Sequence, residues 1–201
     1  MSIIEKIQSQ GGHPSGIIGT LIGHMMNMAH GNIYTWGLQD ITIPMNATCL
    51  DIGCGGGKAV RTLAEKTVTG KVYGLDHSAE MIRLSGRTNH AFITKGIVEI
   101  HQGSISTLPY SDAYFDMVTA FETIQFWPNI PNNVMEIKRV LRPSGTFLIV
   151  NRYPPEQSKW SDFLQLKNAQ AYENMLNAAG FHDITLDTAT KTGWIKVAAR
   201  T

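Results

Sequence analysis

Short apolar runs alternate with helix-like segments along most of the chain. The runs are rich in β-branched and aromatic residues, whereas the segments between them repeat apolar positions with a helical period. Strands that alternate with helices in this way indicate βαβ units and a mainly parallel sheet. The pattern predicts strands over 47–52, 71–76, 97–102, 115–121 and 146–151, with helices over 57–67, 79–92 and 129–141 between them.

The alternation changes towards the C-terminal end of the sequence. A helix is predicted over 159–179 and ends at Gly180. Two strands follow, 184–189 and 194–199, and the connection between them is too short for a crossover, so it makes a hairpin. The expected fold class is α/β, a Rossmann-like doubly wound, seven-stranded sheet that is mostly parallel and has an antiparallel C-terminal strand.

The first 45 residues follow a different pattern. Residues 11–16 have the composition of a loop, and a helix rich in glycine, methionine and isoleucine is predicted over 17–29. A second short helix is predicted over 33–39. We expect residues 1–45 to form an N-terminal helical cap and residues 46–201 to form one compact domain.

Composition narrows the classes of protein to which the chain can belong. Its 201 residues are 43% hydrophobic and 16% charged, which favours a packed core over disorder. The formal net charge of +1 argues against a nucleic-acid partner held by phosphate neutralisation. Since no apolar run is long enough for a membrane span and the N-terminus lacks a signal-peptide core, we expect a cytoplasmic protein with no membrane partner. Its two cysteines, Cys49 and Cys54, match neither a disulfide framework nor a zinc motif, so we expect no metal.

The segment 51–57 is the strongest candidate for a ligand site. An acid ends a predicted strand there, and a glycine-rich turn leads directly into a helix. Glycine adopts positive φ and lets the backbone approach a ligand closely. Asp76 ends the next predicted strand about 20 residues later, which is the separation expected for an acid that accepts hydrogen bonds from ribose hydroxyls. The alternative for Asp76, an N-cap of the following helix, is better served by Ser78.

A dinucleotide site would share much of this pattern, but the spacing of the glycines differs. A G-x-G-x-x-G fingerprint that begins at Gly53 requires glycine at position 58, which is Lys58. An acid within the motif also suits a cationic ligand better than a diphosphate. A nicotinamide dehydrogenase is therefore disfavoured, and the absence of a Tyr-x-x-x-Lys pair on a helix agrees with that.

Taken together, five segments resemble the class I S-adenosylmethionine-dependent methyltransferase family, over roughly residues 45–151. They are 50–57, 72–76, 103–110, 115–118 and 139–146. The resemblance implies a methyltransferase whose cofactor is S-adenosylmethionine and whose product is S-adenosylhomocysteine. Ser104 stands where many members carry an acid for the adenine amino group, and Ser144 replaces a common glycine.

The resemblance also implies the cofactor contacts. The glycine loop would approach the methionine moiety, Asp51 would receive its ammonium group, and Asp76 would bind the ribose diol. The predicted cofactor-binding residues are Asp51, Gly53, Cys54, Gly55, Asp76, His77, Met81, Gly103, Ser104, Ile105 and Phe121.

Transfer of a methyl group from a sulfonium is an in-line displacement, so the protein mainly aligns the reactants and excludes water. A general base is needed only where the acceptor must lose a proton. The catalytic candidates are Glu122, which follows the fourth strand, and His30 in the predicted cap; His24 and Tyr34 are further candidate bases.

The expected acceptor is a small, partly apolar metabolite. Substrate contacts are predicted for Met28, Tyr34, Trp127 and Tyr153, with core packing of the methionines and an aromatic packing corner at Trp127 as the alternatives. The competing function is a non-catalytic module that binds S-adenosylmethionine or S-adenosylhomocysteine and acts through a partner. We expect a monomer or a homodimer.

Overall fold

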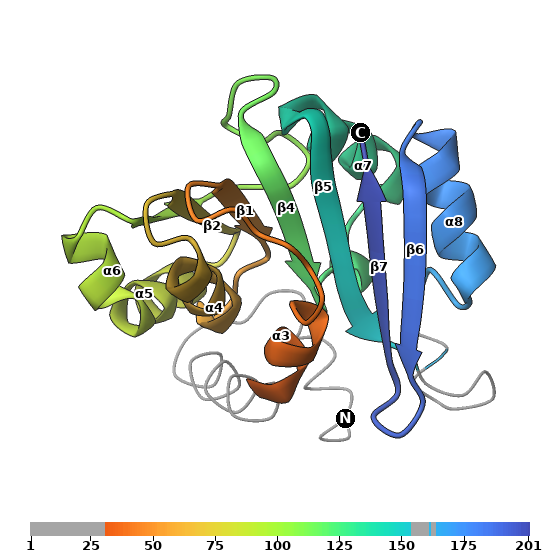
Figure 1. Ribbon diagram of the computed structural model, residues 1–201, viewed down its shortest axis with the longest axis horizontal. Helices are drawn as coiled ribbons and strands as arrows, with labels where there is room; N and C mark the ends of the chain where they lie inside the picture. The colour runs from red at the N-terminus through yellow and green to blue at the C-terminus, as the bar shows by residue number, and fades with distance from the viewer. Residues whose placement is uncertain (1–30, 154–160, 162–163) are drawn as a thin grey trace. The chain divides into compact units, whose positions relative to one another are not determined.

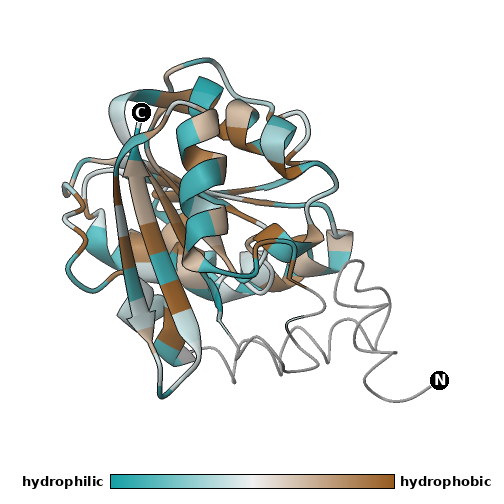
Figure 2. Cartoon of the chain, turned by 90° about the vertical axis from the view of Figure 1, so that its right-hand side faces the viewer, coloured by the Kyte–Doolittle hydropathy of each residue, from teal (hydrophilic) through white to brown (hydrophobic). Residues whose placement is uncertain are grey.

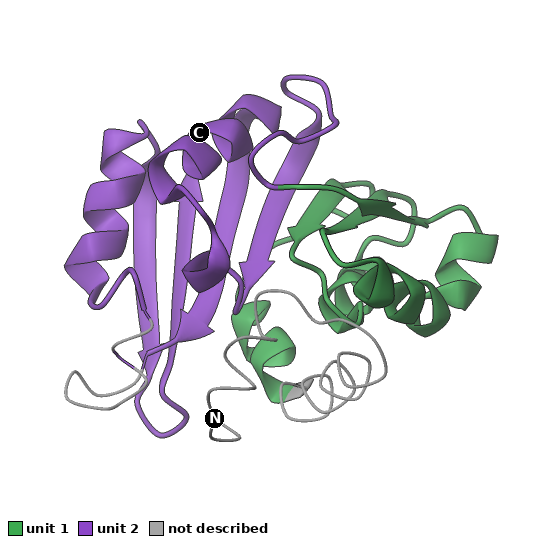
Figure 3. Ribbon diagram, turned by 180° about the vertical axis from the view of Figure 1, so that it is seen from behind, with its two compact units in different colours: residues 1–104 green, residues 105–201 purple. Residues whose placement is uncertain are grey.

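The computed structural model describes residues 31–153, 161 and 164–201. The chain divides into two compact units, unit 1 (Met1–Ser104) and unit 2 (Ile105–Thr201), which Figure 3 shows in different colours. The helix predicted over 17–29 lies outside the described residues.

Unit 1 is built on a parallel sheet in the order β3-β2-β1 (Figure 1). The register places Asp51 beside Gly74 and Asp76 beside Gln102, so the carboxyl ends of the strands lie at the same edge. The described elements of unit 1 are α3 (Gly31–Gly37), β1 (Thr48–Ile52), α4 (Lys58–Lys66), β2 (Lys71–Asp76), α5 (Ala79–Thr88), α6 (His90–Thr94) and β3 (Val98–Gln102).

The helices of unit 1 form because their apolar positions repeat with the helical period. Helix α4 buries Ala59, Val60 and Leu63 and packs on β1 and β2, while α3 packs on α4. Helix α5 begins after Ser78, whose Oγ accepts a hydrogen bond from the Met81 amide at 3.4 Å. These helices fix the position of the loop that joins β1 to α4.

In unit 2 the strands have the order β4-β5-β7-β6. Strands β4 and β5 are parallel, and β7 lies antiparallel between β5 and β6, as the predicted hairpin requires. Hydrophobic and hydrophilic positions alternate along this hairpin (Figure 2). The described elements are β4 (Phe115–Phe121), the 3₁₀ turn η1 (Ile124–Phe126), α7 (Ile130–Val140), β5 (Leu141–Arg152), α8 (Ala169–Ala178), β6 (His182–Ala189) and β7 (Trp194–Arg200).

The core of unit 2 is aromatic and aliphatic. Phe147 on β5 stacks on Trp127 with ring centroids 6.4 Å apart, and Phe181 packs on Phe147 at 5.8 Å. Tyr172 from α8 is fully buried, and its hydroxyl accepts a hydrogen bond from the Asn151 amide at 3.1 Å. Burial raises the pKa of Tyr172 to about 12.

The fold class predicted from the pattern is confirmed. Across the residues that the structure describes there are seven strands, mostly parallel, with an antiparallel strand at the C-terminal end. No helix within these residues is long and apolar enough to cross a bilayer.

Three predicted boundaries are wrong. The helix predicted over 79–92 is two helices, because Asn89 ends α5 and its side chain bonds backbone carbonyls instead of continuing the helix. The helix predicted from 159 includes non-helical residues 164–168, and α8 begins only after Asn168, whose side chain accepts from the Ala171 amide. Strand β5 starts at Leu141 rather than 146, since the turn residues 142–145, with Ser144 at φ 63°, form an irregularity within the strand rather than a break before it.

Candidate functional site

The loop between β1 and α4 folds back onto the end of β2. Gly53, Gly55 and Gly57 all adopt positive φ, at 67°, 48° and 81°, which glycine tolerates without strain. The amides of Gly53 and Cys54 both donate to the Leu75 carbonyl, at 2.8 and 3.0 Å, and the Gly57 amide donates to the Cys54 carbonyl at 2.9 Å. The loop is therefore ordered by backbone hydrogen bonds, both to β2 and within itself.

Asp76 connects this loop to the other strand ends of unit 1. It is buried, and its Oδ2 accepts from the Gly55 amide while its Oδ1 accepts from the Ser78 amide, each at 2.9 Å. Its backbone carbonyl accepts from the Gly103 amide at 2.9 Å. Because an ionised carboxylate offers about four lone-pair sites, Asp76 can still accept two hydrogen bonds from a diol.

The loop has one open and one crowded end. A Cβ built on Gly55 would find, among the described residues, only the Gly53 carbonyl oxygen within 4.0 Å. A Cβ on Gly57 would lie 2.3 Å from Ser85 Oγ and 2.5 Å from Asn89 Nδ2. Among the described residues the loop thus has room for a ligand beside Gly55, whereas Gly57 is packed against α5.

Cys54 lies on the buried side of the loop, with its Sγ 3.9 Å from Ser85 Oγ. Burial raises the pKa of the Cys54 thiol well above its ordinary value, and the negative charges of Asp76 and Asp51 raise it further. The thiol is therefore protonated and unreactive at neutral pH.

The adenine-side candidates have different environments. His77 is exposed, with its Nδ1 3.6 Å from Asp76 Oδ1, and Gln102 donates to its backbone carbonyl at 3.0 Å. Met81 is a buried residue of α5, and Ser104 is exposed after β3. The structure therefore brings Asp76, Gly103 and the glycine loop together, while Met81 belongs to the packed side of α5.

The candidate residues of unit 2 gather where β4 and β5 end. Glu122 follows β4 directly with a φ of 53°, a left-handed conformation that costs a non-glycine residue about 1 kcal/mol or more. Its buried carboxylate pairs with Arg152 at the end of β5, with 3.0 Å between Oε1 and Nε, and the Gln125 side chain donates to its carbonyl at 2.6 Å. Phe121, just before it, is buried and lies beside Val150.

Of the predicted substrate residues, Trp127 is buried in the stack with Phe147, and its Nε1 has no hydrogen-bond partner within the described part of the chain. The Tyr153 hydroxyl accepts from the Ala169 amide at 3.3 Å, so it closes the start of α8. Tyr34 lies on α3 in unit 1 and is partly exposed, and Ile105 is buried. His24, Met28 and His30 lie outside the described residues.

Sequence reasoning missed Asn89 and Arg152. Asn89 was placed inside a continuous helix, where an asparagine is a poor fit, and that mismatch was the available signal. Arg152 lies close enough to pair with Glu122 only because β4 and β5 are neighbouring strands, and no spacing in the sequence indicates this pairing.

Unit 2 also contains an apolar cavity of about 320 Å³ between α7 and α8. None of the predicted site residues lines it. Its lining consists of Ile130, Pro131, Met135, Gln165, Leu166, Met175, Ala178 and Ala179.

A family model described as a methyltransferase domain matches residues 50–149. The chain is 29% identical over 119 residues to a 2-phytyl-1,4-naphtoquinone methyltransferase from Trichormus variabilis, an alignment that covers 59% of this chain and 52% of that protein. It is 25% identical over 169 residues to the uncharacterized methyltransferase YdaC from Bacillus subtilis, with 83% and 88% of the two chains covered. The chain spans about half the length of the first curated relatives it matches.

Among solved structures, a SAM-dependent methyltransferase from Aquifex aeolicus superimposes with a TM-score of 0.78 at 18% identity, covering 90% of this chain and 97% of that one. This likeness shows the fold.

The glycine loop and the acid that follows the second strand define a Rossmann-like class of proteins that bind a nucleoside-containing cofactor at the strand ends. Within that class the chain belongs to the class I S-adenosylmethionine-dependent methyltransferase family, as its motifs predicted. The cofactor of this family is S-adenosylmethionine.

Proposed function

We propose that the protein transfers a methyl group from S-adenosylmethionine to a small, partly apolar acceptor. The observation that carries the proposal is the hydrogen bond between the Gly55 amide and Asp76 Oδ2, because it holds a ribose-binding acid and the open end of the glycine loop in one arrangement. Family membership supplies the chemical class.

The charges around the loop suit this cofactor. Asp51 and Asp76 are both buried, and after burial itself their charges raise the pKa of the Cys54 thiol, so two carboxylates lie close to the loop. A negative site favours the ammonium and sulfonium of S-adenosylmethionine and disfavours a diphosphate. The same observation argues against the nicotinamide alternative.

S-adenosylmethionine supplies an activated methyl group, so the chain has to bind and orient the two reactants and to exclude water. In this proposal Gly53 and Gly55 take the methionine moiety against their exposed backbone, and Asp76 accepts from the ribose hydroxyls. Asp51 receives the ammonium group. His77, Met81, Gly103, Ser104, Ile105 and Phe121 remain the proposed contacts of the adenine and the sulfonium.

The acceptor side is proposed from unit 2. The relative from Trichormus variabilis is named for a phytyl-naphthoquinone, a largely apolar compound, which supports a partly apolar acceptor here. Glu122 is the proposed catalytic carboxylate, and its pairing with Arg152 holds its orientation. Trp127 and Tyr153 are the proposed substrate contacts of unit 2; Tyr34, Met28 and His30 remain predictions for the N-terminal part.

Calorimetric titration with S-adenosylmethionine, S-adenosylhomocysteine and NADH tests the cofactor. Micromolar binding of the first two and none of NADH is expected; binding of NADH alone would overturn the proposal. Transfer of a radiolabelled methyl group to a panel of quinols, phenols and amines then tests the activity. Tight cofactor binding without transfer to any acceptor, together with capture of a protein partner, would favour the non-catalytic module.

Glu122→Gln tests the catalytic carboxylate. If Glu122 removes a proton from the acceptor, the turnover number falls by about 10²- to 10⁴-fold while S-adenosylhomocysteine affinity is unchanged. The matched control is Glu99→Gln, which removes a carboxylate that pairs with Lys71 on the surface of unit 1. Equal turnover for Glu122→Gln and the wild type would limit Glu122 to a structural role.

A further inference from the structure

We infer that Asn89, 32 residues from the glycine loop, is the positioning residue that holds the end of that loop for the cofactor. The inference rests on the proposed function, since it takes the loop to be the cofactor site. Asn89 is fully buried at the junction of α5 and α6. Its Nδ2 donates to the Gly57 carbonyl at 2.9 Å and to the Ser85 carbonyl at 3.0 Å.

Both partners of the Asn89 amide are carbonyl oxygens, and this fixes its orientation. A flipped amide would place Oδ1 against two acceptors, so Nδ2 must face them. The Gly57 carbonyl accepts from Asn89 and also from the Arg61 amide at 3.0 Å, which is the first backbone bond of α4. Asn89 therefore fixes the residue at which the loop ends and the helix begins.

Gly57 needs this external support because it has no side chain to cap α4. It is the N-cap residue, lies in the left-handed region at φ 81°, and makes no side-chain cap bond. A Cβ here would lie 2.5 Å from Asn89 Nδ2, so the glycine and the asparagine fit only as a pair. Asp76 holds Gly55 from the other side at 2.9 Å. The loop is thus fixed at two points, by Asp76 near its open end and by Asn89 at its crowded end.

The asparagine at position 89 has an energetic cost in the folded protein. Its Oδ1 is buried and has no hydrogen-bond partner among the residues that the structure describes, and a buried acceptor left in this state is unfavourable. The residue also ends α5, which continues as the separate short helix α6. If this segment had only to form a helix, leucine or alanine at position 89 would make it more stable. The two hydrogen bonds that Asn89 Nδ2 donates, to the Gly57 and Ser85 carbonyls, explain why an asparagine occupies this position.

The experiment compares Asn89→Ala with Thr67→Val. Thr67 is equally buried, and its hydroxyl donates to the Leu63 carbonyl at the opposite end of α4, so its loss tests a buried hydrogen bond that does not touch the loop. Asn89→Ala should weaken S-adenosylhomocysteine binding by roughly three- to tenfold, the range for one lost hydrogen bond. Thr67→Val should lower stability and leave the affinity unchanged.

Amide hydrogen exchange of the ligand-free proteins gives a second measure. In Asn89→Ala the amides of Gly57 and Arg61 should exchange faster, while the Val72 amide, which bonds Ile97 across the strands, keeps its protection. Unchanged affinity and unchanged exchange at Gly57 in a folded Asn89→Ala protein would overturn the inference.

Two further outcomes are informative. If Asn89→Ala does not fold, hydrogen exchange of the Asn89 side-chain amide protons is measured in the wild type instead. Slow exchange is expected, and fast exchange would overturn the inference. If the wild type binds no S-adenosylhomocysteine, the proposed function fails. The exchange at Gly57 then still shows whether Asn89 holds the loop.

Discussion

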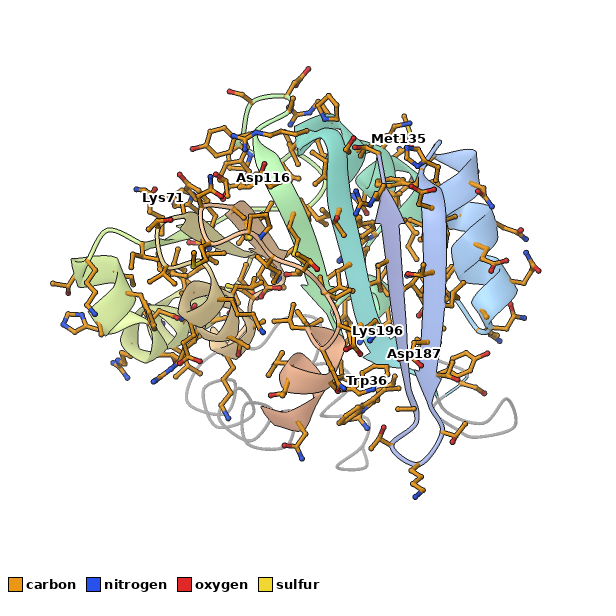
Figure 4. The ribbon with its side chains drawn as sticks, viewed as in Figure 1. Trp36, Lys71, Asp116, Met135, Asp187 and Lys196 are labelled. Carbon is orange, nitrogen blue, oxygen red and sulfur yellow. The ribbon has the colours of Figure 1, made fainter. Side chains whose placement is uncertain are left out.

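The glycine loop of unit 1 is held by backbone groups and short buried side chains, whereas the Glu122 carboxylate of unit 2 is held by a long charged one. In unit 1, Asp76 and Asn89 bond loop amides and carbonyls directly. In unit 2, Arg152 reaches Glu122, and Lys196 on β7 reaches Asp187 on β6 at 3.3 Å (Figure 4). A site held by backbone hydrogen bonds is already arranged for one particular ligand. Side chains that form an ion pair can each pair with another group instead.

Buried polar atoms follow the same division. Among the described residues, unit 2 leaves Gln125 Oε1, Trp127 Nε1 and Asn151 Oδ1 without a hydrogen-bond partner, and unit 1 leaves Asn89 Oδ1. More of these unsatisfied atoms therefore belong to unit 2 than to unit 1.

The largest expected effect is the loss of stability on substitution of Gly57, at the crowded end of the loop. Gly57→Ala should lower the free energy of unfolding by about 4 kcal/mol, since alanine is strained at φ 81° and its Cβ overlaps Ser85 and Asn89. The control is Gly96→Ala, because Gly96 has φ 70° but open space around its Cβ, so only about 1 kcal/mol of strain is expected. Urea unfolding measures both. Equal losses would show that crowding at Gly57 is unimportant.

The next effect tests whether side-chain charges hold unit 2. Arg139 on α7 bonds Glu136, Asp112 and the carbonyls of Leu108 and Tyr110, and it holds the pKa of Glu136 below its ordinary value. Arg139→Ala should cost about 3 kcal/mol of stability, because several charged hydrogen bonds to one segment are lost together. Arg83→Ala, which removes an exposed pair with Glu80, should cost under about 0.5 kcal/mol. A small loss for Arg139→Ala would contradict the comparison.

The third prediction concerns the open end of the loop. Asp76→Asn should weaken S-adenosylhomocysteine binding by about 1–2 kcal/mol, because the amide retains one acceptor for Gly55 but loses the charge and the lone pairs left for the ribose. Asp76→Ala should cost about 1–3 kcal/mol. Asp187→Asn in unit 2 is the control and should leave affinity unchanged. Unchanged affinity in folded Asp76 variants would remove this residue from the ribose role.

The effect that is smallest at neutral pH concerns Tyr172, whose contribution to stability changes at alkaline pH. The pKa of Tyr172 is raised to about 12, so above pH 10 the unfolded chain loses this proton before the folded chain does. Stability should therefore fall between pH 10 and 12 by up to about 1.4 kcal/mol per pH unit from this residue. Tyr172→Phe should cost about 1 kcal/mol at pH 7, for the lost bond with Asn151, and should flatten the alkaline slope. An unchanged slope would assign the effect to other groups, Cys54 foremost.

Much of the architecture was predictable because the hydrophobic period directly reflects which faces are buried. Strands 71–76 and 115–121 were predicted with the bounds that the structure shows, as β2 and β4. The glycine-rich turn and the acid at position 76 predicted a ligand site with a ribose-binding acid, because backbone conformation and ribose binding each require specific residue types, and the family resemblance then implied the cofactor. Ser78 as the cap of α5 followed from its side chain alone.

What failed depended on partners distant in sequence. The break at Asn89 arises because its amide bonds Gly57, and no helical period contains that information. Strand β5 continues through 142–145 because Leu141 pairs with Phe115, although the turn residues favour a loop. The predicted contacts of Met28 and His30 lie outside the described residues and stay predictions.

The sequence by itself determined the alternation of strands and helices and the glycine-rich turn after the first strand, since these depend on residues close together in the chain, and the resemblance of its motifs to a known family indicated the cofactor. Only the tertiary structure decided which buried groups meet: Asp76 with Gly55, Asn89 with Gly57 and Arg152 with Glu122. The physical reason is that a buried hydrogen bond or ion pair needs a partner at about 3 Å, and folding places that partner there from residues 21 to 32 positions away.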